Sequence, residues 1–168
     1  KMNTKTKKLV IAALMAALTC VATMMITIPS PLKGYLNLGD CLVLTAGWML
    51  SPAYGFLAAG IGSALADIFA GYFIYAPATF VIKGFMAIIA GYGFRLLHKK
   101  CTHLISRIFS GAAAELGMVL GYFVFEGFMY GFSASAVNIP ANSVQGIAGL
   151  LIGIVLMKAI ERSKITIE

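Results

Sequence analysis

The chain consists of long apolar stretches separated by short polar or proline-containing segments. A helix that spans the hydrocarbon core of a bilayer needs about 20 predominantly apolar residues. The pattern predicts an all-α membrane protein, a compact six-transmembrane-helix bundle that forms a single domain over residues 1–168. The predicted helices occupy residues 9–28, 38–50, 53–71, 78–97, 105–130 and 140–160, of which the second is the shortest.

Positive charge supports this count and orients the helices. Basic residues flank three places: the start of the first helix, the loop between the fourth and fifth helices, and the end of the sixth. Cytoplasmic loops carry an excess of Lys and Arg. Six spans place all three clusters on the cytoplasmic side, whereas five spans would move the middle cluster outside. We therefore predict that both termini are cytoplasmic.

Composition excludes several classes of protein. The chain is 60% hydrophobic and 11% charged, whereas soluble domains are about 25% charged. Its net charge of +7 comes from residues at helix ends, so we expect no nucleic acid partner. The sequence contains no catalytic motif and no spacing typical of metal ligands, which predicts no enzyme activity, no cofactor and no metal. Polarity confined to one side disfavours a channel.

Small residues recur at four-residue intervals in three predicted helices. One such ridge runs through Ala58, Gly62, Ala66 and Ala70, and Gly117 with Gly121 and Gly149 with Gly153 repeat the spacing. Small residues let membrane helices approach closely. We interpret these ridges as internal packing surfaces.

Five charged residues interrupt the apolar segments: Asp40, Asp67, Lys83, Glu115 and Glu126. A charge in hydrocarbon is unfavourable by several kcal/mol unless it is paired or hydrated. All except Glu115 fall in the outer part of the predicted bundle. Asp67 and Lys83 either neutralise each other or contact a ligand, and Asp40 suits a helix N-terminus. Glu126 has no evident local partner, which favours a functional role, and Glu115 has no assigned role.

Other polar and aromatic side chains gather on the same outer side. Apolar walls with aromatic faces and a few polar anchors are typical of a small-molecule site. We therefore predict a cavity for a small, flat, polar ring compound. The alternative interpretation is that the tyrosines belong to the belt of aromatic residues found at membrane interfaces. The gathered residues are Tyr35, Asn37, Tyr75, Thr79, Tyr122, Tyr130, Asn138, Asn142 and Gln145.

Three stretches resemble a known family. They are Gly34-Tyr-Leu-Asn-Leu-Gly-Asp40, Gly60-Ile-Gly-Ser-Ala-Leu-Ala-Asp67 and Tyr75-Ala-Pro-Ala-Thr-Phe-Val-Ile-Lys-Gly84. They resemble the substrate-binding S components of energy-coupling factor (ECF) transporters, and the resemblance extends over nearly the whole chain. Within that family they are most similar to the branch for hydroxymethylpyrimidine, pyridoxine-type compounds and riboflavin. The resemblance implies a multi-pass protein of a prokaryotic plasma membrane that binds a vitamin from outside.

The resemblance also implies partners and a mechanism. The S component would dock on a transmembrane coupling subunit carried by two ATPases, topple in the lipid bilayer and release its cargo inside. An Ala-x-x-x-Ala face on the first helix would dock; it matches Ala12 and Ala16, with Ala13 and Ala17 one step round the helix.

The family's pocket, formed by the first outer loop and the outer ends of later helices, maps onto eight residues. The loop would also act as a lid, and Lys83 with Asp67 or Glu126 would hold opposite edges of a heteroaromatic ring on which tyrosines stack. Riboflavin is the alternative cargo, and a small membrane channel or enzyme the alternative class. The predicted substrate-binding residues are Tyr35, Asn37, Asp67, Tyr75, Lys83, Glu126, Asn138 and Asn142.

Overall fold

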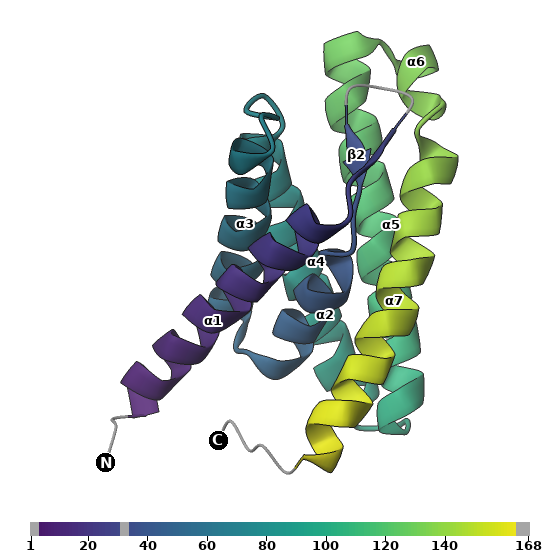
Figure 1. The fold of residues 1–168 in the computed structure, drawn as a ribbon. Coiled ribbons are helices and arrows are strands. Elements are labelled where there is room, and N and C mark those ends of the chain that lie inside the picture. Colours follow the sequence, from purple (N-terminus) through teal and green to yellow (C-terminus); the bar gives the residue numbers. More distant parts are fainter. Residues whose placement is uncertain (1–3, 31–33, 164–168) are drawn as a thin grey trace.

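A computed structural model describes residues 4–30 and 34–163, which form a helical bundle with one small hairpin (Figure 1). Within these residues, five helices are long and apolar enough to cross a membrane. They are α1 (Thr4–Met25), α3 (Pro52–Phe69), α4 (Ala76–Leu97), α5 (His103–Tyr130) and α7 (Ile139–Arg162). Two short helices, α2 (Asp40–Met49) and α6 (Phe132–Ala136), and the strands β1 (Ile28–Pro29) and β2 (Tyr35–Leu36) complete the fold.

The predicted helix boundaries differ from the structure most at α1, which begins at Thr4 rather than Leu9, and in the stretch 132–139. Helix α1 ends at Met25 rather than Ile28 because Ile28 and Pro29 pair antiparallel with Leu36 and Tyr35. A residue that precedes proline also disfavours the helical conformation. The stretch 132–139, predicted as a loop, contains the short helix α6. Gly131, at a φ of 93°, separates α5 from α6, a conformation that glycine adopts without steric penalty.

Helix α2 forms within the predicted segment 38–50 but is only ten residues long. At 1.5 Å per residue it covers about 15 Å, which is half the thickness of a hydrocarbon core. Instead of facing lipid it is buried against α1, α3, α4 and α7. Val43, Leu44 and Trp48 belong to the main core cluster, and the Trp48 indole donates to Ser110 Oγ at 3.1 Å.

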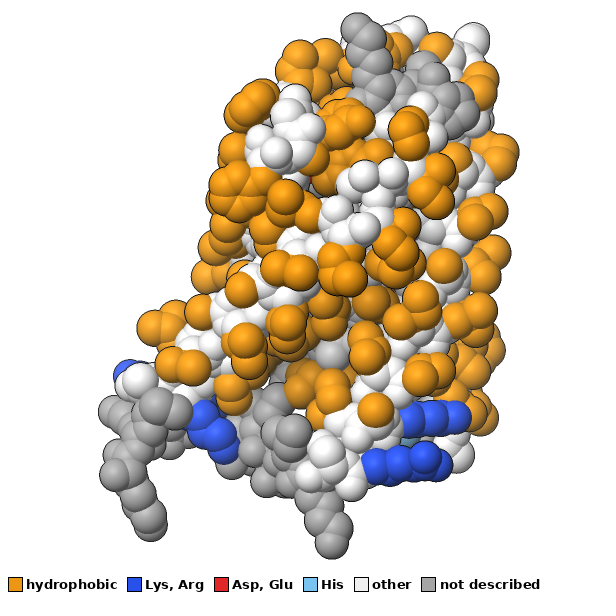
Figure 2. Space-filling view, in the orientation of Figure 1, with side chains coloured by type: hydrophobic (Ala, Val, Ile, Leu, Met, Phe, Trp, Pro, Cys, Tyr) orange, Lys and Arg blue, Asp and Glu red, His pale blue; other side chains and the backbone are white. Residues whose placement is uncertain are grey.

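Helices α1, α3 and α5 run away from one end of the bundle, α2, α4 and α7 run back toward it, and both described ends of the chain lie at that end (Figure 1). That end carries the described basic side chains near the starts of α1 and α5 and the ends of α4 and α7. Figure 2 shows the pattern on one face: hydrophobic side chains cover most of it, and Lys and Arg gather at its lower edge. We refer to this as the basic end.

Close helix contacts explain the ridges of small residues. Gly62 of α3 faces the backbone oxygen of Ala16 in α1 so closely that a Cβ atom would overlap it. Ala58 and Ala66 on the same ridge are also buried. Without a hydrophobic drive between helices in lipid, such close backbone contact provides much of the packing energy. Ala58, Gly62 and Ala66 therefore form an internal packing surface, as predicted, whereas Ala70 caps the end of α3 and is exposed.

Candidate binding site

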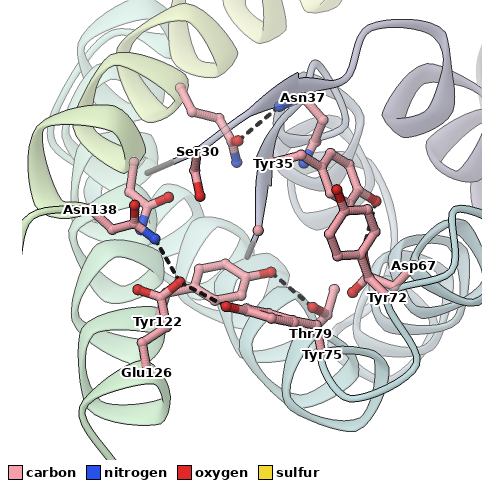
Figure 3. A pocket seen from close by; sticks show the side chains of 13 residues that line it. Ser30, Tyr35, Asn37, Asp67, Tyr72, Tyr75, Thr79, Tyr122, Glu126 and Asn138 are labelled. Carbon is pink, nitrogen blue, oxygen red and sulfur yellow. Dashed lines mark hydrogen bonds between the residues drawn. The ribbon is translucent and has the colours of Figure 1, made fainter. Parts of the chain in front are cut away.

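A polar pocket lies at the end of the bundle opposite the basic end (Figure 3). It lies between the hairpin, the 72–75 loop and the ends of α3, α4, α5 and α7 that are remote from the basic end, and the space in it that admits the centre of a water molecule is about 30 Å³. Its lining consists of Ser30, Gly34, Tyr35, Asn37, Asp67, Tyr72, Tyr75, Thr79, Tyr122, Glu126, Asn138, Asn142 and Gln145.

Every predicted binding residue except Lys83 lines this pocket. Their contact with a ligand stays a prediction. Ser30, Gly34 and Tyr72 also line the pocket, and nothing in the sequence separates them from ordinary loop residues. From the sequence, Tyr72 is indistinguishable from a tyrosine of the aromatic belt at a membrane interface. Only the fold brings it next to Tyr35, with ring centroids 4.7 Å apart.

Glu126 occupies one side of the pocket (Figure 3). The Asn138 amide donates to its Oε1 at 2.8 Å and the Tyr75 hydroxyl donates to the same atom at 3.4 Å. The expectation that Glu126 has no local partner is therefore wrong, because α7 begins beside the end of α5. Its Oε2 atom is buried and has no hydrogen-bond partner among the described residues.

Asp67 occupies the other side (Figure 3). The Tyr35 hydroxyl donates to Asp67 Oδ1 at 2.7 Å and so ties β2 to α3. Burial, and then the nearby Asp67 carboxyl, raise the pKa of the Tyr35 phenol above its ordinary value, which keeps this hydroxyl a donor. Asp67 Oδ2 is buried without a hydrogen-bond partner in the part of the chain that the structure describes.

Lys83 forms its ion pair with Asp40 and not with Asp67. Both side chains are buried, and Asp40 also accepts from Gln145 Nε2 at 2.6 Å. Asp40 lies in the first turn of α2, as expected for a carboxylate near a helix N-terminus, but the cap residue is Gly39 and no side chain makes a capping hydrogen bond there. The physical reason is the burial of α2, which points its first side chain at α4 and α7 instead of water.

Glu115, which the sequence left without a role, is buried and has no hydrogen-bond partner for either oxygen among the described residues. Its carboxyl packs against Gly146 and Gly149 of α7, outside the pocket lining.

The two residues predicted to dock a partner face inward. Ala12 is 6% exposed and packs in a cluster with Met15, Leu50 and Ala58. Ala16 is partly buried, whereas Ala13 and Ala17 are exposed. The Ala-x-x-x-Ala spacing therefore occurs twice on α1, and the copy open to a partner is Ala13 with Ala17.

Metal binding receives no support from the described residues, which contain no group of three His, Cys, Asp or Glu side chains able to hold an ion.

Comparison with known proteins places the chain in a family. The model of the family "ECF-type riboflavin transporter, S component" matches residues 3–162. The thiamine precursor transporter HmpT of Lactococcus lactis is 30% identical over 165 residues, which cover 97% of this chain and 93% of that protein. An uncharacterized protein of Pyrococcus woesei is 36% identical over 135 residues, 79% of this chain and 87% of the relative.

Solved structures share the fold. The S component of a bacterial ECF transporter aligns with a TM-score of 0.65 at 18% identity, over 96% of this chain and 99% of that one. The S component for biotin from an ECF-type ABC transporter aligns with a TM-score of 0.62 at 19% identity, over 94% and 95%. The chain therefore belongs to the family of ECF-type riboflavin transporter S components, membrane proteins that bind a vitamin and pair with an ECF module, and it is a transport protein and not an enzyme.

Proposed function

We propose that the pocket binds a small amino-substituted heteroaromatic vitamin precursor of the hydroxymethylpyrimidine type. The observation that carries the proposal is the pair of acidic side chains on opposite sides of the pocket. Asp67 Oδ2 and Glu126 Oε2 are both buried acceptors without a protein donor in the described region. Buried polar groups without partners are rare and call for one. A ligand that presents hydrogen-bond donors at two edges would satisfy both.

The lining sets the charge of the ligand. No Lys or Arg is among the described residues that line the pocket. Two acidic groups in the lining repel phosphate and favour neutral or cationic compounds. The predicted arrangement, in which Lys83 holds one edge of the ring, is therefore replaced by one in which Asp67 and Glu126 hold both edges. The pyrimidine 4-amino and 5-hydroxymethyl groups supply donors at adjacent positions on one edge of the ring. Ring N1 lies across the ring from the amino group and supplies a donor at the opposite edge when it is protonated.

Size supports the same class. The space in the pocket that admits the centre of a water molecule is only about 30 Å³, so this conformation has no room for a large ligand. Tyr75 and Tyr122 lie along the floor in Figure 3 and offer ring faces for stacking. A single pyrimidine ring suits this space better than a three-ring flavin with a ribityl chain. The match to HmpT, a thiamine precursor transporter, points the same way.

Riboflavin is the second candidate, because the matching family is described by that vitamin. It would require the hairpin and the 72–75 loop to move apart. Pyridoxine has the size of the first candidate but lacks the amino group.

We further propose how the protein sits and works. The basic end faces the cytoplasm of a prokaryotic cell, in accord with the positive-inside rule, so the pocket opens outside. The short helix α2 and the segment before it form the sixth crossing. Uptake is driven by two ATPases through a transmembrane coupling subunit. That subunit contacts the exposed face of α1 at Ala13 and Ala17, where small side chains allow close helix approach.

The test is calorimetric titration of the purified protein in mild detergent. The titrants are 4-amino-5-hydroxymethyl-2-methylpyrimidine, its monophosphate, pyridoxine and riboflavin. We expect the unphosphorylated pyrimidine to bind tightest and the monophosphate not to bind. Tight binding of riboflavin alone would reject the pyrimidine proposal and keep the family function.

Site variants sharpen the test. Glu126→Gln puts an amide donor where the ligand's donor needs an acceptor, so affinity should fall roughly 10- to 150-fold, the range of a charge-assisted hydrogen bond. Asp67→Asn should act similarly. Glu115→Gln is the matched control, since it makes the same chemical change at a buried carboxyl outside the pocket. Unchanged affinity in Glu126→Gln would contradict the assignment.

A further inference from the structure

The buried ion pair of Asp40 and Lys83 lies behind the pocket, and neither residue lines it. Gln145 connects the pair to the pocket. Its Nε2 donates to Asp40 Oδ2 at 2.6 Å, and its Oε1 accepts from the backbone N–H of Asn37 at 2.9 Å. One side chain thus joins α2, α7 and the residues that follow β2.

Charge determines the orientation of this amide. An ionised carboxylate only accepts hydrogen bonds, so Gln145 must turn its NH₂ group toward Asp40. Its oxygen then points away, to the backbone N–H of Asn37. The reverse orientation would place oxygen against carboxylate and NH₂ against N–H, and both bonds would be lost. The ion pair therefore sets the anchor point of residues 34–39, which we call the hairpin segment.

A second contact links the pair to the opposite wall. Lys83 Nζ lies 5.5 Å from the centre of the Tyr122 ring, a distance at which a cation attracts the ring face. The Tyr122 hydroxyl is 3.0 Å from Thr79 Oγ1, and both residues line the pocket.

We propose that Asp40 and Lys83 are positioning residues for ligand binding that hold the hairpin segment over the pocket through Gln145. They touch no ligand. Asp40 fixes the orientation of Gln145, and Lys83 holds the Asp40 carboxyl in place through the ion pair. The consequence for ligand release rests on the proposed function, whereas the anchoring itself exists in the empty protein.

Hydrogen exchange measured by mass spectrometry on the ligand-free protein tests the anchor. Gln145→Leu removes both hydrogen bonds and leaves the ion pair intact. Loss of one backbone anchor should raise the exchange rate of the hairpin segment about five-fold or more, while exchange in α3 stays unchanged. An unchanged rate in the hairpin segment would overturn the anchoring role of Gln145.

A second variant tests the role of the ion pair. Asp40→Leu/Lys83→Met removes both charges together, so neither is left buried alone. Gln145 remains but loses the group that orients it, and exchange of the hairpin segment should again rise. Wild-type exchange in this variant would overturn the role of Asp40. If the variant does not fold, Asp40→Asn replaces it, since an amide at position 40 accepts either orientation of Gln145.

Glu115→Gln is the control in the same neighbourhood, because its carboxyl lies beside α7 but bonds to nothing in this network. Exchange in the hairpin segment should match the wild type. A rise equal to that in Gln145→Leu would show a general loosening of the core and reject the specific network. With a binding compound in hand, Gln145→Leu should release it at least about five-fold faster. Failure of every compound to bind would reject the proposed function and leave the exchange result standing.

Discussion

Removal of one charge from the Asp40–Lys83 pair is the change whose effect follows most directly from the structure. Lys83→Met preserves the length and apolar stem of the side chain and deletes only the ammonium. Asp40, which is fully buried, then keeps its hydrogen bond from Gln145 and loses its counter-ion. Asp40→Leu produces the opposite situation, with an unpaired ammonium beside Tyr122.

The magnitude follows from the burial of both partners. Breaking a buried pair from one side costs about 3–5 kcal/mol, because an uncompensated charge remains. For a chain of this size that lowers the unfolding midpoint by roughly 6–20 °C. The double variant Asp40→Leu/Lys83→Met leaves no charge, and its main loss is the acceptor for Gln145, worth about 1–3 kcal/mol. The double variant should therefore be more stable than either single variant.

Thermal unfolding in one detergent, followed by the fluorescence of Trp48 in the core, measures all three variants. The double-mutant cycle gives the coupling between the two positions. Additive losses, or single-variant losses below about 1 kcal/mol, would refute the reasoning, since they would mean that water reaches both groups. Glu115→Gln supplies the control for replacing a buried carboxyl that has no described partner.

Three further outcomes are expected. Glu115→Gln should leave the unfolding midpoint unchanged or raise it, because it removes an unpaired acidic group near Asp40. A decrease in the free energy of unfolding above about 2 kcal/mol would contradict the absence of a partner for Glu115. Gly62→Leu should lower the midpoint by several degrees, or by about 1–3 kcal/mol, since the new side chain meets the backbone of Ala16; a stability equal to the wild type would show that α1 is not packed there. Ala17→Trp should preserve ligand binding in detergent but reduce co-purification with the coupling subunit, because the position is exposed on α1; undiminished co-purification would place the docking surface elsewhere.

Hydrophobic pattern and residue type alone were enough to place the helices and most of the pocket residues. A long apolar run indicates a segment in contact with lipid, and it can be recognised from the composition of that segment alone. The predicted segments therefore match α1, α3, α4, α5 and α7 to within a few residues, apart from the earlier start of α1. Polar residues in such runs are also unfavourable without a partner, so Asp67 and Glu126 stood out as site candidates before their neighbours were known.

Pairing and facing directions came only from the tertiary structure. Asp67 and Asp40 are both acidic residues in the part of the bundle that the sequence predicts to be outer, and nothing local distinguishes which one meets Lys83. The short, buried α2 decides it by presenting Asp40 to α4. The same limit applies to α1, where Ala12 and Ala13 are one residue apart but face opposite environments. A single sequence carries the periodicity of a helix, but the rotation of that helix relative to its neighbours depends on close packing between segments far apart in the chain.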